Sequence, residues 1–459
     1  MTAGTADTAI KGGVLVSGKG MNRADLFIKD GLVDGIEPAG GTRLAKKVID
    51  ASGRLVLPGI IDVHLHPVYA DRIGGVSVSG AHGGVTTLIP YIGAVKSWGG
   101  GDGALDVMKN FIEEGERDSV VDFALHCVLI HDDVETADTL IPEAIKLGVT
   151  SFKGFMAYSR RGMKLEDGEL MRIMEIIAAN GGLFATHAEN GAMIDFLVDR
   201  FIAQGKTTPE YYLQGHPKIA ETEAVFRILG LAKALKCPIY LPHLSAWESL
   251  DVVRMFREWG ESEVYAETCV HYLTLTDDEL KKRGGLAKVG PPLRQQKDVE
   301  EMWRAVDEGV IDVIATDAVG YMMKDRGPIW DNIFEVPFGL PGIESLLTVT
   351  YDEGVNKGRT TLPKLVKSMT ETPARIFGLY PKKGVLEPGS DADVVIFDPT
   401  VPHVITAENQ HLNADYTMHE GRQCLGAPTV VMQRGEILIE GGELKANPGR
   451  GSFLARTVS

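Results

Sequence analysis

The stretch LPGIIDVHLH, residues 57–66, places a short apolar run directly before two histidines that are two positions apart. The run is rich in β-branched residues and does not alternate with polar ones, which is typical of a strand buried on both faces, as in a parallel sheet. In a strand, residues i and i+2 point to the same side, so His64 and His66 would face a common point. The stretch therefore predicts a buried parallel strand that carries two imidazoles at its carboxyl end.

Seven further apolar runs follow, and helical patterns separate most of them from one another. Together with the first, they span residues 57–63, 85–90, 121–130, 149–156, 182–186, 238–241, 264–268 and 311–315. Between the fourth and the fifth, apolar residues recur every three or four positions from Leu170 to Ala178, which predicts an amphipathic helix. Eight strands alternating with helices predict an α/β fold, a (β/α)₈ barrel of the TIM type over residues 56–383.

The two ends of the chain differ from this repeat. In residues 9–54 and 384–445, short strand-like pieces are broken by Gly and Asp, and no long helix is evident. Neither end alone is large enough for a core, so we expect residues 1–55 and 384–459 to combine into one small β-sandwich domain. The segment NPGRGSFLARTVS (447–459) is predicted to be an exposed tail and is a candidate subunit contact.

The composition limits the classes of function. Asp and Glu outnumber Lys and Arg by 63 to 47, and this net charge of −16 argues against a nucleic-acid partner. The four cysteines include no CxxC pair and are typical of reduced thiols. No apolar run approaches the roughly 20 residues of a membrane helix, and no secretory signal pattern is visible. We therefore expect a cytoplasmic protein with no membrane partner.

Side chains of metal-ligand type follow several of the other predicted strands. They are Lys153, His187, His243 and Asp317. Each has an ordinary interpretation when taken alone: a core or rim histidine, a lysine extending to the rim, or an aspartate capping a helix. In a βα barrel, however, the carboxyl ends of the strands converge at one mouth, where active sites lie. Imidazole and carboxylate are ligands of ions such as Zn²⁺, so the joint pattern predicts a site for two divalent metals.

Lys153 has a particular place in this prediction. A lysine directed into a barrel mouth is costly to bury as a cation, and burial lowers its pKa. The neutral amine can add CO₂ to give a carbamate, which is an anionic ligand able to bridge two ions.

The order of these motifs resembles the cyclic amidohydrolases of the dihydropyrimidinase and hydantoinase type. The motifs are HLH (64–66), FKGFMAY (152–158), THAEN (186–190), PHLS (242–245) and TD (316–317). The resemblance extends to GGVTT (83–87), AETCVHYL (266–273), GPPLR (290–294), GLPGIES (339–345), TPARIFGLYPKKG (372–384) and LEPGSDADVVIFDP (386–399), and so covers nearly the whole chain. It implies metal-dependent opening of a hydantoin-like or dihydropyrimidine-like ring to an N-carbamoyl amino acid, through a hydroxide that bridges two metal ions.

The resemblance also implies a role for each residue. The metal ligands would be His64, His66 and Asp317 for one ion, His187 and His243 for the other, and Lys153, as N6-carboxylysine, for both. Zn²⁺ is the expected metal. Tyr158 would stabilise the developing oxyanion, and Asp317 would carry a proton to the leaving nitrogen. Members of this family suggest a homodimer or homotetramer.

The chain departs from the family pattern at some positions near the expected substrate. The implied substrate-binding residues are Tyr158, Gly290, Phe338 and Gly339. Family members commonly have Ser in place of Gly290, Asn in place of Phe338, and His in place of Ala318. Main-chain contacts to the cyclic amide would survive these changes, whereas Phe338 adds apolar bulk. We therefore expect a bulkier or more apolar ring substituent.

Alternative functions stay open at this point. An allantoinase-like or cyclic-imide hydrolase shares the same ligand pattern, although allantoinases commonly lack the tyrosine found here as Tyr158. Dihydroorotases place an arginine where this chain has Val68. A non-catalytic scaffold related to the dihydropyrimidinases would keep the fold and lose ligands, whereas all six ligand positions are present here.

Overall fold

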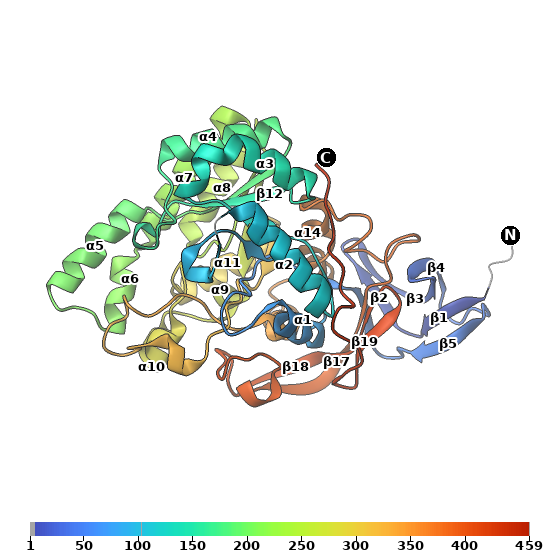
Figure 1. The fold of residues 1–459 in the computed structure, drawn as a ribbon. Coiled ribbons are helices and arrows are strands. Elements are labelled where there is room, and N and C mark those ends of the chain that lie inside the picture. Colours follow the sequence, from blue (N-terminus) through green and yellow to red (C-terminus); the bar gives the residue numbers. More distant parts are fainter. Residues whose placement is uncertain (1–4, 102, 459) are drawn as a thin grey trace.

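Strands from both ends of the chain form one ten-stranded sheet in the computed structural model, which describes residues 5–101 and 103–458. Its strands are β1 (Ala6–Lys11), β2 (Val14–Ser17), β3 (Gly20–Lys29), β4 (Leu32–Pro38), β5 (Ala45–Asp50), β6 (Leu55–Pro58), β17 (Val394–Ile405), β18 (Arg422–Gln433), β19 (Glu436–Glu440) and β20 (Glu443–Leu444). Strand β6 pairs antiparallel with β17, with Pro58 opposite Val394. The N-terminal and C-terminal strands therefore lie side by side, at one end of the molecule (Figure 1).

The apolar core of this sheet is shared between the two ends of the chain. Leu26 and Val56 from the N-terminal strands pack in one buried cluster with Ile396 and Val430 from the C-terminal strands. Because apolar burial is the main favourable term in folding, each end supplies a surface that the other covers.

The middle of the chain forms parallel strands in two sheets, so the protein has a mixed α/β fold. The strands are β7 (Ile60–Asp62), β8 (Val85–Leu88), β9 (Tyr91–Ile92), β10 (Asp122–Phe123), β11 (His126–Val128), β12 (Ser151–Phe155), β13 (Leu183–His187), β14 (Ile239–Leu241), β15 (Val264–Cys269) and β16 (Val313–Ala315). Three of them pair in the order β10-β8-β7, and seven pair in the order β16-β15-β14-β13-β12-β11-β9. The third predicted run is divided between β10 and β11. The second forms only β8, and Pro90, which has no N–H for the ladder, lies between β8 and β9.

The first and the eighth predicted strands end beside each other. Leu65 and Ala318 form an isolated parallel bridge, and the amide of His66 donates to the carbonyl of Ala318 at 2.9 Å. Two residues before Ala318, the amide of Thr316 donates to Asp62 Oδ1 at 3.2 Å. These contacts bring the HLH and TD motifs together across the seam between the two sheets.

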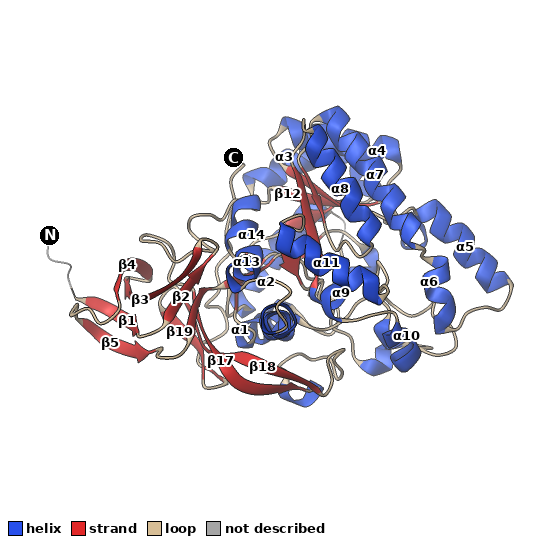
Figure 2. Ribbon diagram, turned by 180° about the vertical axis from the view of Figure 1, so that it is seen from behind, coloured by secondary structure: helices blue, strands red, loops and turns tan. Residues whose placement is uncertain are grey.

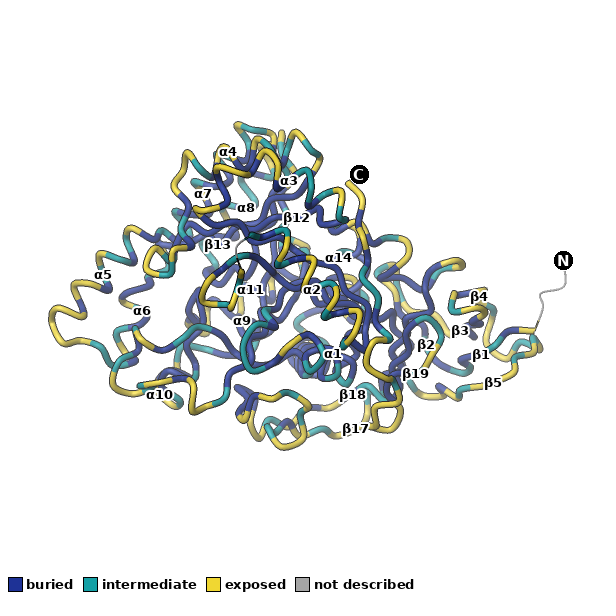
Figure 3. Tube along the Cα trace, viewed as in Figure 1, coloured by how far each residue is buried: buried dark blue, intermediate teal, exposed yellow. Residues whose placement is uncertain are grey.

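Helices surround the parallel strands (Figure 2). They are α1 (Ile73–His82), α2 (Ala104–Asp118), α3 (Ala137–Lys146), α4 (Asp167–Ala179), α5 (Gly191–Ala203), α6 (Tyr212–Gly215), α7 (Lys218–Leu235), α8 (Trp247–Trp259), α9 (Val270–Thr274), α10 (Asp278–Arg283), α11 (Gln296–Glu308), α12 (Leu346–Thr350), α13 (Leu362–Met369) and α14 (Glu371–Ile376). The apolar stripe predicted for α4, which includes Leu170 and Ile177, is buried. Chain segments on the outside of the molecule are exposed (Figure 3). Within the described ranges, no helix combines the length and the apolar character needed to cross a membrane.

The prediction of an exposed C-terminal tail is wrong for residues 451–456. The amide of Phe123 in β10 donates to the carbonyl of Ser452 at 3.0 Å, and the amide of Leu454 donates back to Phe123 at 2.7 Å. Arg456 is only 2% exposed. The segment behaves as a short extra strand, because β10 offers it main-chain hydrogen bonds and its apolar side chains pack against the core.

A buried ion cluster connects β10 with the ten-stranded sheet. Lys383 Nζ lies 2.6 Å from a carboxylate oxygen of Asp122 and 2.8 Å from those of Asp391 and Asp393. Arg434 forms a second ion pair with Asp122 at 2.7 Å. Burial alone would lower the pKa of Lys383, but the three carboxylates raise it above its ordinary value.

Candidate metal centre

Three of the predicted ligands come from the ends of the first and the eighth predicted strands. His64 Nε2 lies 3.1 Å from Asp317 Oδ1, and His66 Nε2 lies 3.3 Å from the same oxygen. One donor atom from each of these three residues lies within 4.8 Å of the others. This spacing is compatible with a single divalent ion held among them.

The other three predicted ligands lie within β12, at the end of β13 and just after β14, and they face the same point. Lys153 Nζ lies 3.1 Å from His64 Nε2, and His187 Nδ1 lies 3.1 Å from His243 Nε2. The His64 and His243 rings are 5.2 Å apart between their centres, which connects the two groups. The structure thus brings all six predicted ligand residues together at the carboxyl ends of the parallel strands.

Three residues of the site have left-handed backbone conformations. The φ angles are 68° for Tyr158, 43° for His243 and 47° for Asp317. Non-glycine residues adopt this region at an energetic cost, and such strain concentrates at functional sites, where the surrounding fold enforces it. In each case the unusual turn comes just after a predicted strand, where it sets the direction of the side chain.

The protonation states of His66 and Asp317 favour cation binding. Burial lowers the pKa of His66 to about 4, so its imidazole is neutral and has a free lone pair. Burial would raise the pKa of Asp317, but the neighbouring His64 and His66 hold it well below the usual range, so the carboxylate is ionised. Neutral imidazoles and ionised carboxylates are the forms in which these side chains bind metals, and this donor set fits divalent ions.

The amine of Lys153 is also shifted toward its neutral form. The side chain is 1% exposed, and burial lowers the pKa of Lys153 to about 8. Its nearest polar neighbour, His64 Nε2, offers no negative charge. A substantial neutral fraction near physiological pH follows, and a neutral amine is the form that can react with CO₂.

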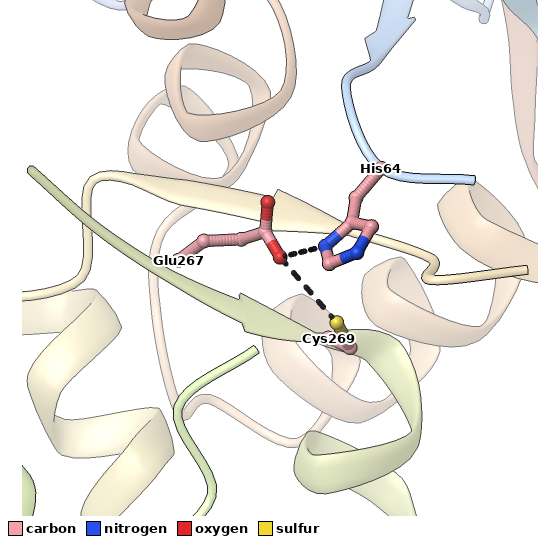
Figure 4. A group of neighbouring side chains, drawn as sticks. All are labelled: His64, Glu267 and Cys269. Carbon is pink, nitrogen blue, oxygen red and sulfur yellow. Dashed lines mark hydrogen bonds and ion pairs between the residues drawn. The ribbon is translucent and has the colours of Figure 1, made fainter. Parts of the chain in front are cut away.

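Glu267 lies behind His64, and sequence reasoning missed its role. One of its carboxylate oxygens is 2.6 Å from His64 Nδ1 and accepts from the amide of His243 at 2.9 Å (Figure 4). The other oxygen accepts from the Tyr240 hydroxyl at 2.7 Å. Because Nδ1 of His64 is occupied in this way, Nε2 is left to face Asp317 and the centre of the site. Its position in β15, within AETCVHYL, was the available signal.

Glu189 performs the same task for His187. Its carboxylate lies 2.7 Å from His187 Nε2, so that Nδ1 is the nitrogen directed at His243. Glu189 stands two residues after His187, and this i, i+2 spacing could have identified it. Each of the two groups of ligands therefore has one buried carboxylate that orients a histidine.

A narrow cavity of about 60 Å³ leads to the ligands. All four predicted substrate-binding residues line it: Tyr158, Gly290, Phe338 and Gly339. A Cβ atom on Gly290 would lie 2.4 Å from Tyr158 Oη and 3.0 Å from the Phe338 ring. Any side chain at position 290 would therefore displace the Tyr158 hydroxyl and press against the Phe338 ring, so Gly290 keeps open the space that Tyr158 occupies.

The sequence model of a protein family, described as "Amidohydrolase family", matches residues 55–438 of the chain. The protein belongs to the amidohydrolase family. The chain is 36% identical to a D-hydantoinase of Ralstonia pickettii, over 98% of this chain and 99% of the relative. It is 35% identical to a D-phenylhydantoinase of Escherichia coli, over 97% of each. A solved structure titled L-hydantoinase (dihydropyrimidinase) from Arthrobacter aurescens superposes with a TM-score of 0.91 at 32% identity, covering 98% of this chain and 100% of that one.

Membership of this family implies divalent metal binding. His64, His66 and Asp317 form a candidate ligand group on geometry alone. The group His64, Glu267 and Cys269 also has converging donor atoms, but Cys269 Sγ is directed at Glu267 at 3.7 Å and the group lies beneath the cavity. The former group lies at the mouth, where a substrate has access.

Proposed function

We propose that this protein hydrolyses a cyclic amide bond in a hydantoin-like or dihydropyrimidine-like ring and releases an N-carbamoyl amino acid. The observation that carries the proposal is the convergence of six ligand-type side chains beside a cavity lined by Tyr158. The names of the relatives, D-hydantoinase and D-phenylhydantoinase, support the substrate class. The proposed frame is a closed (β/α)₈ barrel of residues 56–383 with a β-sandwich domain of residues 1–55 and 384–459.

The proposed cofactors are two divalent metal ions, with Zn²⁺ expected. The ligands would be His64, His66 and Asp317 for one ion, His187 and His243 for the other, and Lys153, as N6-carboxylysine, for both. When bound, such ions lower the pKa of a water molecule and polarise a carbonyl group. Carboxylation would replace the buried amine of Lys153 by an anion, which removes the unfavourable cation and supplies a bridge.

Asp317 and Tyr158 are the proposed catalytic residues. The ionised Asp317 can accept the proton of the attacking water and return it to the leaving ring nitrogen. Burial raises the pKa of Tyr158 well above its ordinary value, so the phenol keeps its proton and can donate to the carbonyl oxygen as negative charge develops there. We assign ring binding to the main chain of Gly290 and Gly339, with Phe338 as an apolar wall.

A substrate panel tests this proposal. Metal-replete protein is given hydantoins, dihydropyrimidines, allantoin, dihydroorotate and cyclic imides, and ring opening is followed by absorbance and by mass spectrometry. We expect hydantoins or dihydropyrimidines to be opened, and Tyr158→Phe to lower kcat by about 10²-fold, the scale for one oxyanion donor. Preferred turnover of allantoin or imides would replace the proposal by one of the alternatives. Absence of all turnover, in protein that retains no metal after incubation with Zn²⁺, would favour a non-catalytic scaffold.

The remaining partner and location assignments are proposals from the sequence. We propose a homodimer or homotetramer in the cytoplasm. Light scattering at several protein concentrations tests the assembly.

A further inference from the structure

Arg161 lies on the loop after β12, where two cavities meet. The narrow cavity of about 60 Å³ at the ligands and an outer cavity of about 430 Å³ both include this arginine in their walls. Tyr69, Tyr158 and Phe338 line both cavities as well. A ring held at the metal ligands would therefore extend its substituent past these four side chains.

The guanidinium of Arg161 has neutral partners. Its Nη2 donates to Tyr69 Oη at 3.1 Å and to Ser97 Oγ at 3.4 Å, and its central carbon lies 5.7 Å from the centre of the Tyr158 ring. Among residues 5–101 and 103–458, no carboxylate forms an ion pair with it. An arginine is permanently protonated and offers five N–H groups in a planar fork. An uncompensated positive charge therefore borders the passage from the ring to the outer cavity.

The acidic residues of the outer cavity are engaged elsewhere. Asp195 accepts from the Ser159 hydroxyl and lies 3.8 Å from Arg160. Glu335 accepts from the side-chain amide of Asn332 at 2.7 Å. These contacts keep both carboxylates paired with partners other than Arg161, so the charge of Arg161 is available to a ligand.

We propose that Arg161 selects cyclic amides whose ring substituent carries a carboxylate. This inference rests on the proposed hydrolysis and adds the chemical class of the substituent. A carboxylate matches the guanidinium fork, with which it forms paired, charge-assisted hydrogen bonds. Phe338 contributes the apolar wall that the sequence indicates, and it would contact the carbon atoms between the ring and the carboxylate.

The test compares two ligands of nearly equal shape, hydantoin-5-acetate and hydantoin-5-acetamide, as racemates and as separated enantiomers. For the metal-replete wild type we expect kcat/KM to favour the acetate by about 10- to 100-fold, the range for one charged hydrogen-bonded contact. The difference is expected mainly in KM and should shrink as sodium chloride is added. Arg161→Gln should abolish the preference while the acetamide is still turned over.

Arg172→Gln is the control, because it removes the same charge from an exposed residue of α4 that pairs with Asp138 and lies outside both cavities. It should keep the preference, and loss of the preference in this variant would overturn the assignment to Arg161. Equal or better turnover of the acetamide by the wild type would refute the proposal.

Calorimetric binding of the same two ligands reads the charge preference without turnover. Selective acetate binding that Arg161→Gln removes would support the inference even if no ring is opened, which is the outcome that contradicts the proposed hydrolysis. Equal binding of both ligands would overturn the inference.

Discussion

Two lysines with the same burial lie in two different kinds of charged cluster. Lys153 at the strand ends and Lys383 beside β10 are each 1% exposed. Lys383 is surrounded by Asp122, Asp391 and Asp393, and its pKa is raised, whereas the pKa of Lys153 is lowered to about 8. The nearest neighbours of the Lys153 amine are an imidazole nitrogen at 3.1 Å and the Tyr91 ring, whose centre is 4.1 Å away.

The difference separates a structural cluster from a functional one. Around Lys383 the charges compensate each other within the chain, so the cluster stabilises the connection between β10 and the ten-stranded sheet. Around Lys153 the charges are not compensated in this way: among the described residues no carboxylate pairs with its amine, and the buried His66 Nδ1 and Glu189 Oε1 have no hydrogen-bond partner. A buried group of that kind is completed by a ligand from outside the chain.

Replacing the lysine at the strand ends should have the largest effect. Lys153→Met is expected to reduce ring opening to background and to lower the metal content, because the bridging ligand is lost. The stability of the metal-free protein should change little, since methionine replaces an amine whose charged form is disfavoured by burial. Activity, metal analysis and urea unfolding of the purified variant provide the measurements. Full activity in Lys153→Met would remove Lys153 from the proposed centre, and Lys164→Met is the control at a half-buried lysine after β12, whose amine pairs with Glu166.

The same substitution at the other lysine should reverse the pattern. Lys383→Met leaves buried carboxylates without their cation, and we expect the free energy of unfolding to fall by about 3–5 kcal/mol. Because the folded pKa of Lys383 lies above its ordinary value, this stabilisation is present at neutral pH and is lost only as the pH rises through the folded pKa. Urea unfolding at several pH values tests both points.

The metal content per folded molecule should not change in Lys383→Met. Lys382→Met, at the exposed neighbouring residue, should leave stability unaltered. A Lys383 variant that keeps wild-type stability and loses metal would contradict the distinction between the two clusters.

The smallest expected effect concerns Glu267, the buried carboxylate that orients His64 in the cluster around Lys153. Glu267→Gln keeps a hydrogen-bond acceptor beside His64 and removes its charge, so we expect metal affinity to fall by about 10- to 100-fold with the fold intact. Competition with a chromogenic chelator measures the affinity. Glu263→Gln, at an exposed position just before β15, is the control. If both variants bind metal as the wild type does, Glu267 does not position His64.

The sequence was informative where side chains of metal-ligand type recur near the carboxyl ends of the predicted strands. His64, Lys153, His187, His243 and Asp317 could be found because each lies in or just after an apolar run, and the structure brings them together. Such reasoning depends only on strand direction, which the pattern of short apolar runs supplies.

What could not be predicted depends on contacts between distant residues. Glu267 stood inside a recognised motif, but only the structure shows that its oxygen meets His64. The close approach of Tyr158 and Phe338 to Gly290 is a steric relation between distant segments, and it has no counterpart in the local sequence of any of them. The segment 451–456 was predicted to be exposed because its local sequence carries no sign of a partner strand, whereas in the structure it forms main-chain hydrogen bonds with Phe123 of β10.

Strand β17 and residues 451–456 are translated long after the strands with which they pair, and this order has a consequence for biosynthesis. Strand β6 ends at Pro58, but its partner β17 begins only at Val394. Strand β10 pairs with residues 451–456, which are translated later still. A nascent chain emerging from the ribosome therefore carries unpaired strand edges, at β6 in the ten-stranded sheet and at β10 in the three-stranded sheet, until residues 394–456 have been translated. Such edges are prone to aggregation, so translational arrest before residue 456 should leave a chaperone-dependent chain that gains protease resistance only once this segment has emerged.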